Sequence, residues 1–337
     1  MNFTFYALFL AAALLVSGCA TKSSSPDWIA GESEKYRSSL YLLGRGDASG
    51  MEEAKDRARA DLSKTFQVAV SADSNDVQKF KSDSTVAAGA GVYSSESSRR
   101  ISTSTEQIIR GIQIAETWQD PVSNQQHALA ILPRLQAATS LRQQITQLDD
   151  SIQSSVDQSK NSTDVLAKIA AASKAVDSQL ERDGLQKALQ VVDPTGRGSD
   201  SKYSSTRLKL DLDELLRRVR VAPKILQGST PGLEQIVAGA LSKAGFMVES
   251  GEKPDFLLKA SLVLTDIGIR EGWYWQRGNL EISMSEVASG RVRGTQRWPI
   301  KSSATDQAGA IRRALDEADS VLKRELGKTI AGMAISQ

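Results

Sequence analysis

The hydrophobic pattern of the first folded region alternates between strand-like and helix-like stretches. Residues 36–46 contain a short apolar run that ends in glycines, which predicts a strand followed by a tight turn. From Ser49 onward apolar residues recur at steps of three and four, which predicts a helix. Its buried side is expected to hold Ala54, Ala58 and Leu62. Three further segments are predicted to be strands: residues 66–71, 108–118 and 126–132.

The middle of the chain carries two helical patterns. They cover residues 135–192 and are separated by a polar break at 157–163, which predicts an antiparallel helical hairpin. An alternative is that these helices form a coiled-coil seam that recruits a second copy of the chain. The sequence does not decide this alternative, because the repeat is shorter than the roughly three to four heptads that such a seam requires. Residues 193–229 are expected to be a linker followed by a segment whose structure the pattern leaves undefined.

The last segment, residues 230–337, is predicted to be a small α-β-β-β-α domain. Thr230 before Pro231 has the chemistry of a helix start, and Gly245 that of a helix end. Three alternating strands and a final helix follow, the helix beginning at a capping box over residues 303–306. With residues 27–134 as the first domain, the fold class is α+β: two small α/β-sandwich domains joined by a helical hairpin.

The N-terminus indicates secretion and lipid attachment. Residues 5–16 are apolar but too short to cross a bilayer, which needs about 20 such residues, and they fit the core of a signal peptide at 1–18. Val16-Ser17-Gly18-Cys19 resembles the bacterial lipobox. That resemblance implies cleavage between Gly18 and Cys19, acylation of Cys19, a polar tether over 19–26 and an outer-membrane anchor facing the periplasm. Unlike an ordinary signal peptide, residues 1–5 contain no Lys or Arg.

Composition excludes several kinds of active site. Cys19 and His127 are the single cysteine and histidine of the 337 residues, so a multi-His or Cys/His metal centre within one chain is excluded. His127 lies in an apolar run and is interpreted as a structural strand residue. The net charge of +2 argues against bulk nucleic-acid binding. The spacing of Gly44, Gly46 and Gly50 misses the dinucleotide-binding pattern by one residue and is interpreted as a turn. We therefore expect no cofactor, no metal and no catalysis.

The first domain resembles a known family. The features that carry the resemblance are the order and spacing of Pro26-Asp27-Trp28, the strand with Gly44 and Gly46, the helix with Ala54, Ala58 and Leu62, and Phe66-Gln-Val-Ala-Val. Together, over about residues 19–135, they resemble the lipoprotein-twenty (Lpp-twenty) family of bacterial outer-membrane lipoproteins. A flagellar assembly lipoprotein is similar over the same segment, and the C-terminal domain is similar in shape to modules of periplasmic assembly factors. These resemblances imply a scaffold or assembly role.

One strand pair of the C-terminal domain carries candidate binding residues. In the strand 273–286, strict alternation places Leu280, Ile282 and Met284 on the core face and two tryptophans on the other. The next strand would place three arginines beside them, a combination typical of binding hot spots. The candidate set is Trp273, Trp275, Arg291, Arg293 and Arg297. Two alternatives stay open: a bulge at Gly278 that reverses the alternation, or arginines that merely pair with Glu281 and Glu286.

These observations favour a lipid-anchored envelope lipoprotein with a structural, scaffold or assembly role, bound to the membrane by its N-terminal lipid and to a protein or peptidoglycan partner. A periplasmic hydrolase would need an acid and a base facing one cleft, and no such acidic pair stands in an apolar motif. Two alternatives are not decided by the sequence: that the chain is a component of an oligomeric secretion or flagellar-associated assembly, and that it forms a homo-oligomer.

Overall fold

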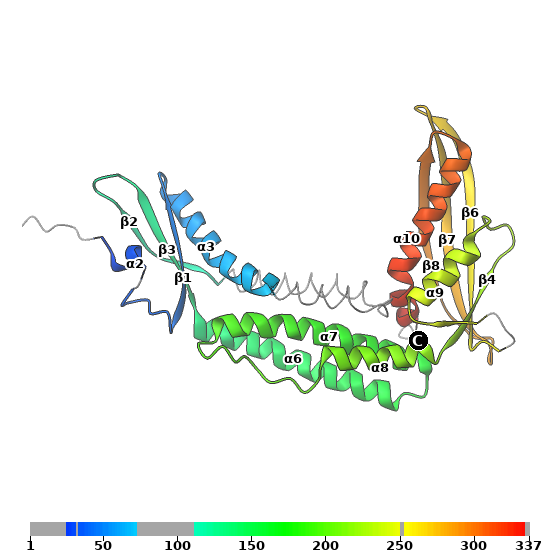
Figure 1. Cartoon of the computed structure of the whole chain (residues 1–337), viewed down its shortest axis with the longest axis horizontal. Helices are drawn as coiled ribbons and strands as arrows, with labels where there is room; N and C mark the ends of the chain where they lie inside the picture. The colour runs from blue at the N-terminus through cyan, green and yellow to red at the C-terminus, as the bar shows by residue number, and fades with distance from the viewer. Residues whose placement is uncertain (1–24, 32, 73–110, 250–252, 334–337) are drawn as a thin grey trace, which may run out of the picture. The chain divides into compact units, whose positions relative to one another are not determined.

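The computed structural model describes residues 25–31, 33–72, 111–249 and 253–333, with backbone alone for 66–72. These residues form an α+β fold, as predicted (Figure 1). The chain divides into two compact units, Met1–Ser63 with Ile112–Pro133 and Lys64–Gly111 with Arg134–Gln337. The expected signal peptide, Gly18, Cys19 and the predicted loop at 81–105 lie outside the described residues.

The first unit is a three-stranded antiparallel sheet with a helix on one face. The strands are β1 (Tyr41–Ala48), β2 (Gln113–Gln119) and β3 (Gln126–Pro133), in the order β1-β3-β2. Helix α3 (Met51–Ala72) buries Ala54, Ala58 and Leu62 completely, as its spacing predicts. The predicted strand at 66–71 is wrong, because α3 continues through it. Leu62, Phe66 and Val70 also recur every four residues, and no Gly or Pro interrupts this stretch.

Two glycines of β1 let helix α3 lie unusually close to the sheet. Gly44 and Gly46 pair with Ala130 and Ala128 inside the strand, so the predicted turn at this point is wrong. A Cβ on Gly46 would stand 2.3 Å from the Ala54 carbonyl oxygen, and one on Gly44 would stand 2.4 Å from the Ala58 carbonyl oxygen. Their role is close packing of backbone against backbone.

A short N-terminal segment covers the opposite face of this sheet. Helix α2 (Asp27–Ala30) places Trp28, which is 2% exposed, against Leu129 and Ile131. The Trp28 indole Nε1 donates to Glu116 Oε2 at 2.9 Å, and Lys35 Nζ donates to Glu116 Oε1 at 2.6 Å. The hydrogen bond from Lys35 is the main reason that the pKa of Glu116 lies below its usual value. The unit is therefore a sandwich of helix, sheet and N-terminal segment.

We expect Gly46→Ala to destabilise this unit by about 1–3 kcal/mol, the usual range for overpacking, because the added methyl group meets backbone atoms that cannot move independently. Gly50→Ala is the matched control, since a Cβ there has no heavy atom within 4 Å. Hydrogen exchange of the β3 amides should be faster in Gly46→Ala and unchanged in Gly50→Ala. Equal exchange in the two variants would contradict the close approach of α3.

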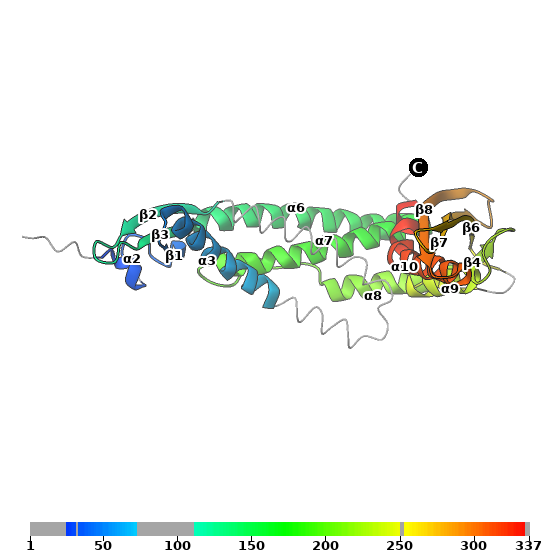
Figure 2. The same ribbon diagram turned by 90° about the horizontal axis from the view of Figure 1, so that it is seen from above.

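The second unit begins with the predicted helical hairpin, formed by α6 (Arg134–Asn161) and α7 (Val165–Val192). The two helices run side by side in both views (Figures 1 and 2). Helix α8 (Ser205–Arg217) packs along α7 through Leu208, Leu212 and Leu216. A small recess of about 290 Å³ lies between the three helices, with Val156, Ala172 and Leu208 in its lining.

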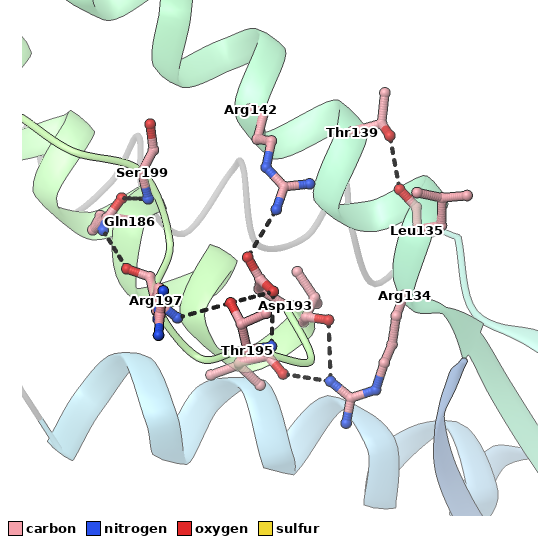
Figure 3. A network of polar contacts seen from close by, with 11 residues as sticks. Arg134, Leu135, Thr139, Arg142, Gln186, Asp193, Thr195, Arg197 and Ser199 are labelled. Carbon is pink, nitrogen blue, oxygen red and sulfur yellow. Dashed lines mark hydrogen bonds and ion pairs between the residues drawn. The ribbon is translucent and has the colours of Figure 1, made fainter. Parts of the chain in front are cut away.

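The residues after the hairpin, expected to be a linker, are bound back onto it (Figure 3). Arg134 donates to the last carbonyl groups of α7, at 2.9 Å to Val191 and 3.1 Å to Val192. Arg142 pairs with Asp193 at 2.8 Å, and the same carboxylate accepts hydrogen bonds from the backbone and hydroxyl of Thr195. Arg182, 1% exposed, donates to Asp149 at 2.7 Å and to the Ser199 carbonyl at 3.3 Å. Polar contacts thus fix this segment.

The C-terminal sheet has five strands in the order β5-β4-β6-β7-β8. Helix α9 (Leu233–Lys243) and helix α10 (Gln307–Met333) pack on it. The undefined segment 193–229 contributes α8 and β4, which runs parallel to β6 and β5. Thr230 does not cap α9, because its hydroxyl donates to the Leu262 carbonyl at 2.9 Å and Gly232 takes the N-cap position. The bounds are β4 (Arg220–Ile225), β5 (Met247–Val248), β6 (Phe256–Arg270), β7 (Trp273–Glu286) and β8 (Val292–Ala304).

One ion pair joins the turn of the hairpin to the sheet. Arg293 lies at a bulge of β8 and, although charged, its side chain is 5% exposed. It pairs with Asp164, whose carboxylate also caps α7 by accepting from the backbone of Leu166 at 2.9 Å and Ala167 at 3.3 Å. Burial disfavours the charged form of Asp164, but the hydrogen bonds from Arg293 and the cap outweigh it, and the pKa of Asp164 is lowered.

We expect Asp164→Asn to destabilise the second unit by about 3 kcal/mol, because asparagine preserves the helix cap but leaves the buried guanidinium without its counter-charge. The matched control is Asp211→Asn, which breaks an exposed pair with Arg207 at 3.0 Å and should cost less than about 1 kcal/mol. Urea denaturation of the two variants measures both. Losses of similar size would show that the joint contributes no more than a surface ion pair.

Candidate functional site

The candidate site is the face of the C-terminal sheet opposite α9 and α10. Both helices lie on one side of the sheet in the view from above (Figure 2). The strand residues under them are fully buried, including Leu258, Leu280, Ile282 and Ile300. Side chains of the alternate residues point to the other side. There Val263 is 54% exposed, which indicates that the described helices leave this side uncovered.

This open side carries cations in directly opposed pairs. Arg277 of β7 pairs in register with Lys301 of β8, and Lys224 of β4 with Lys259 of β6. Like charges directly opposite each other on one sheet face destabilise the sheet. On the same side of the sheet, the acidic residue Glu281 of β7 stands opposite Arg297 of β8. Arg297 Nε donates to Glu281 Oε2 at 2.9 Å. We call the following residues the basic face: Lys224, Lys259, Trp275, Arg277, Arg297 and Lys301.

Both predicted tryptophans lie at one end of this side. Trp273 is 42% exposed and Trp275 is half-buried. Lys301 Nζ lies 4.7 Å from the centre of the Trp275 ring, within the range of a cation–π contact. The Trp275 indole Nε1 donates to the Arg270 carbonyl at 3.4 Å. The ring of Trp275 is therefore held in place next to the cations.

The predicted arginines do not all share this side. Arg297 belongs to it, and Arg291 is an exposed residue just before β8. The placement of Arg293 beside the tryptophans is wrong. The pairing jumps from Met284–Gly294 to Ser285–Val292, so the bulge reverses the alternation at Arg293 and turns it to the buried side. The alternative of a bulge at Gly278 is also wrong, since Gly278 pairs regularly with Leu264 and Ile300.

Four residues of the basic face are not among the predicted binding residues. Lys259, Arg277 and Lys301 stand at alternate positions of strands that the pattern identifies, so their shared side could have been read from parity. The side of Lys224 could not be predicted in this way, because β4 lies in the undefined segment and pairs in parallel with residues of β6 that are 35 positions further along the chain. What the basic face can do chemically is to donate hydrogen bonds to anionic groups and to stack on planar ones.

The other residues considered for chemistry have structural surroundings. The His127 ring in β3 lies 5.3 Å from that of Trp118, and His127 pairs in register with Asp47. Among the described residues, no group of three His, Cys, Asp or Glu side chains is placed to hold a metal ion. In the same residues, no helix combines the length and apolar character needed to span a bilayer.

Comparisons with solved structures show a distant likeness to other secreted proteins and lipoproteins. Curated proteins yield no match. The chain is similar to the secreted protein HP1454 from Helicobacter pylori, with 12% identity and a TM-score of 0.44 over 85% of this chain and 97% of that one. It is also similar to a putative lipoprotein from Caulobacter crescentus, with 12% identity and a TM-score of 0.26 over 34% of this chain and 92% of that one. At these values the structural likeness supports no functional argument.

Residues 26–132 match the model of the LPP20 lipoprotein family. The match covers the N-terminal segment that holds Trp28, the glycine-bearing strand β1, helix α3 and both remaining strands of the first sheet. It confirms the resemblance predicted over about residues 19–135: the first unit carries an LPP20 lipoprotein domain, and the chain is an envelope lipoprotein.

Proposed function

We propose that this lipoprotein is a non-catalytic scaffold, anchored to the outer membrane through Cys19 and facing the periplasm, whose basic face binds an acidic protein partner. The observation that carries the proposal is the opposition of Arg277 to Lys301, and of Lys224 to Lys259, on an uncovered sheet face. Each pair costs stability in the free protein. An anionic partner would remove that cost, which makes its binding more favourable.

The tryptophan and the arginines of the face favour a protein partner over the cell wall. Trp and Arg are the residues enriched at the centres of protein interfaces, where a fixed aromatic ring loses little freedom on binding. Trp275 is held by Lys301 and by its bond to the Arg270 carbonyl, so the ring is ordered before any partner arrives. Peptidoglycan also carries carboxylates, and its binding is the competing outcome of the tests below.

A binding role also agrees with the surroundings of three carboxylates whose pKa is lowered. Hydrogen bonds donated by Lys35, Trp28 and Tyr36 lower the pKa of Glu116. Asp193 is lowered mainly by Thr195, and Asp255 by hydrogen bonds from Arg220 that outweigh its burial. Each of these carboxylates forms hydrogen bonds between two segments of the fold, and such structural contacts shift pKa values without any catalytic role.

We expect a photo-crosslinking residue at Asn279, in the middle of the basic face, to form a discrete adduct with an acidic protein in intact cells. Asn279 is exposed and lies between the rows of Arg277 and Glu281. Reversing the neighbouring charges with Arg277→Glu and Lys301→Glu should abolish the adduct. The yield of the adduct, followed by mass spectrometry of the partner, is the measurement.

A crosslinker at Arg312 is the matched control, because Arg312 is equally exposed but lies on α10, which covers the other face. It should form no such adduct. If the Asn279 adduct survives charge reversal, or if purified sacculi rather than a protein retain the chain in a charge-dependent manner, the proposed partner is wrong.

We expect the wild-type chain to incorporate labelled palmitate in growing cells and Cys19→Ala to incorporate none. The reason is that acylation of this motif needs a thiolate, and Cys19 is the single cysteine. Without acylation the variant should remain uncleaved, with its signal peptide attached, or become soluble. Equal labelling of the two chains would rule out Cys19 as the anchor.

A further inference from the structure

The tip of the β6–β7 hairpin extends past the helices that cover the sheet. Gln307, the first residue of α10, donates from its side-chain amide to Asp266 Oδ2 at 2.8 Å, so the helical layer begins at the level of Asp266. In Figure 1 the end of the hairpin projects beyond that end of α10. The last pair of the ladder is Arg270–Trp273, and it encloses a two-residue turn. Both turn residues, Glu271 and Gly272, have positive φ, as in the tight turns that match strand twist.

This tip exposes apolar side chains on both of its sides. Ile269 is 60% exposed and Trp273 is 42% exposed. They occupy neighbouring rows of the ladder, Ile269 with Tyr274 and Trp273 with Arg270, so they point to opposite sides of the hairpin. A protein partner docked flat on the basic face would contact one of these sides. Exposed apolar groups on both sides of a narrow tip fit immersion in a medium that surrounds it.

The charges near the tip favour an anionic medium. Arg270 is the partner of Trp273 in the ladder, and Arg277 and Lys301 lie on the same side further from the turn. Guanidinium groups donate to phosphate oxygens, and cations near an anionic membrane surface strengthen binding to it. Glu271, at the turn itself, opposes insertion. Its carboxylate would hold the tip at the depth of the headgroups, which is where tryptophan is preferred.

We propose that this hairpin tip, defined as Ile269, Arg270, Glu271 and Trp273, inserts into the headgroup layer of a bilayer that contains anionic phospholipid. The contact is separate from the N-terminal acyl anchor, and it goes beyond the proposed partner of the basic face. It would give the C-terminal domain its own attachment to a membrane, at the opposite end of the sequence from Cys19.

The test uses the chain from Ala20 to Gln337, which lacks the acyl anchor but keeps every described residue. Flotation with vesicles of phosphatidylcholine and phosphatidylglycerol, and with vesicles of phosphatidylcholine alone, gives partition coefficients. We expect partitioning into the anionic vesicles, and Ile269→Ser with Trp273→Ser should lower it by at least about tenfold, or about 1.4 kcal/mol. Glu271→Gln should raise it by about fivefold, because a repulsive charge is removed.

Val292→Ser is the matched control: Val292 is 55% exposed and pairs with Ser285, at the far end of the same sheet. Its partitioning should equal that of the wild type. The proposal is overturned if the wild-type chain does not float with anionic vesicles or if Val292→Ser loses as much binding as the tip variant. It is also overturned if Arg277→Ser with Lys301→Ser abolishes binding while the tip variant retains it, because the basic face would then hold the lipid. The Asn279 adduct reports on the protein partner independently of all three outcomes.

Discussion

The packing of the second unit depends on one ion pair, in which Asp164 neutralises the buried charge of Arg293. A buried guanidinium is costly unless a counter-charge meets it, and Asp164 provides that charge from the N-cap position of α7. The same carboxylate caps the helix, so the start of α7 and the bulge of β8 share one anion. Around this joint, side chains of the hairpin such as Val156 and Leu166 enter the same core as Leu258 and Ile282. The hairpin is therefore part of the C-terminal core rather than a spacer between two domains.

The bulge in β8 marks the point at which prediction from the hydrophobic pattern fails. Where one repeat governs a long segment, the pattern was sufficient: the hairpin at 135–192 and the core positions Leu280, Ile282 and Met284 are confirmed. Parity fails for Arg293 because one extra residue in β8 reverses the side to which every earlier side chain points. The buried charge of Arg293 is neutralised by Asp164, which is 129 positions away in sequence. A local sequence pattern does not predict such a contact.

Two other failures have the same origin in contacts between distant segments. Gly44 and Gly46 have the composition of a turn, but their function is to admit the backbone of α3, which local sequence does not distinguish from conformational freedom. The segment after the hairpin is rich in Gly, Ser and Asp, and so resembles a linker. It is ordered by Arg142 and Arg182 of the hairpin, which donate to the Asp193 carboxylate and to the Ser199 carbonyl of this segment. Hydrophobic periodicity predicted the helices, whereas polar contacts of the arginines determine how the connecting chain lies.

The uncovered side of the sheet shows that its charge pattern is not imposed by the fold. In one row Glu281 stands opposite Arg297, so this sheet can place acid against base on this side. Four residue pairs further along the same two strands, Arg277 stands opposite Lys301. A single acidic substitution at either position would convert a repulsive pair into an attractive one of the kind already present. The Arg277–Lys301 pair therefore gives the free protein no ion-pair stabilisation, and the stabilising contact in this row is the cation–π contact of Lys301 with Trp275. A negative charge from another molecule would offset the repulsion between Arg277 and Lys301, and this is the physical basis of the binding role proposed for the face.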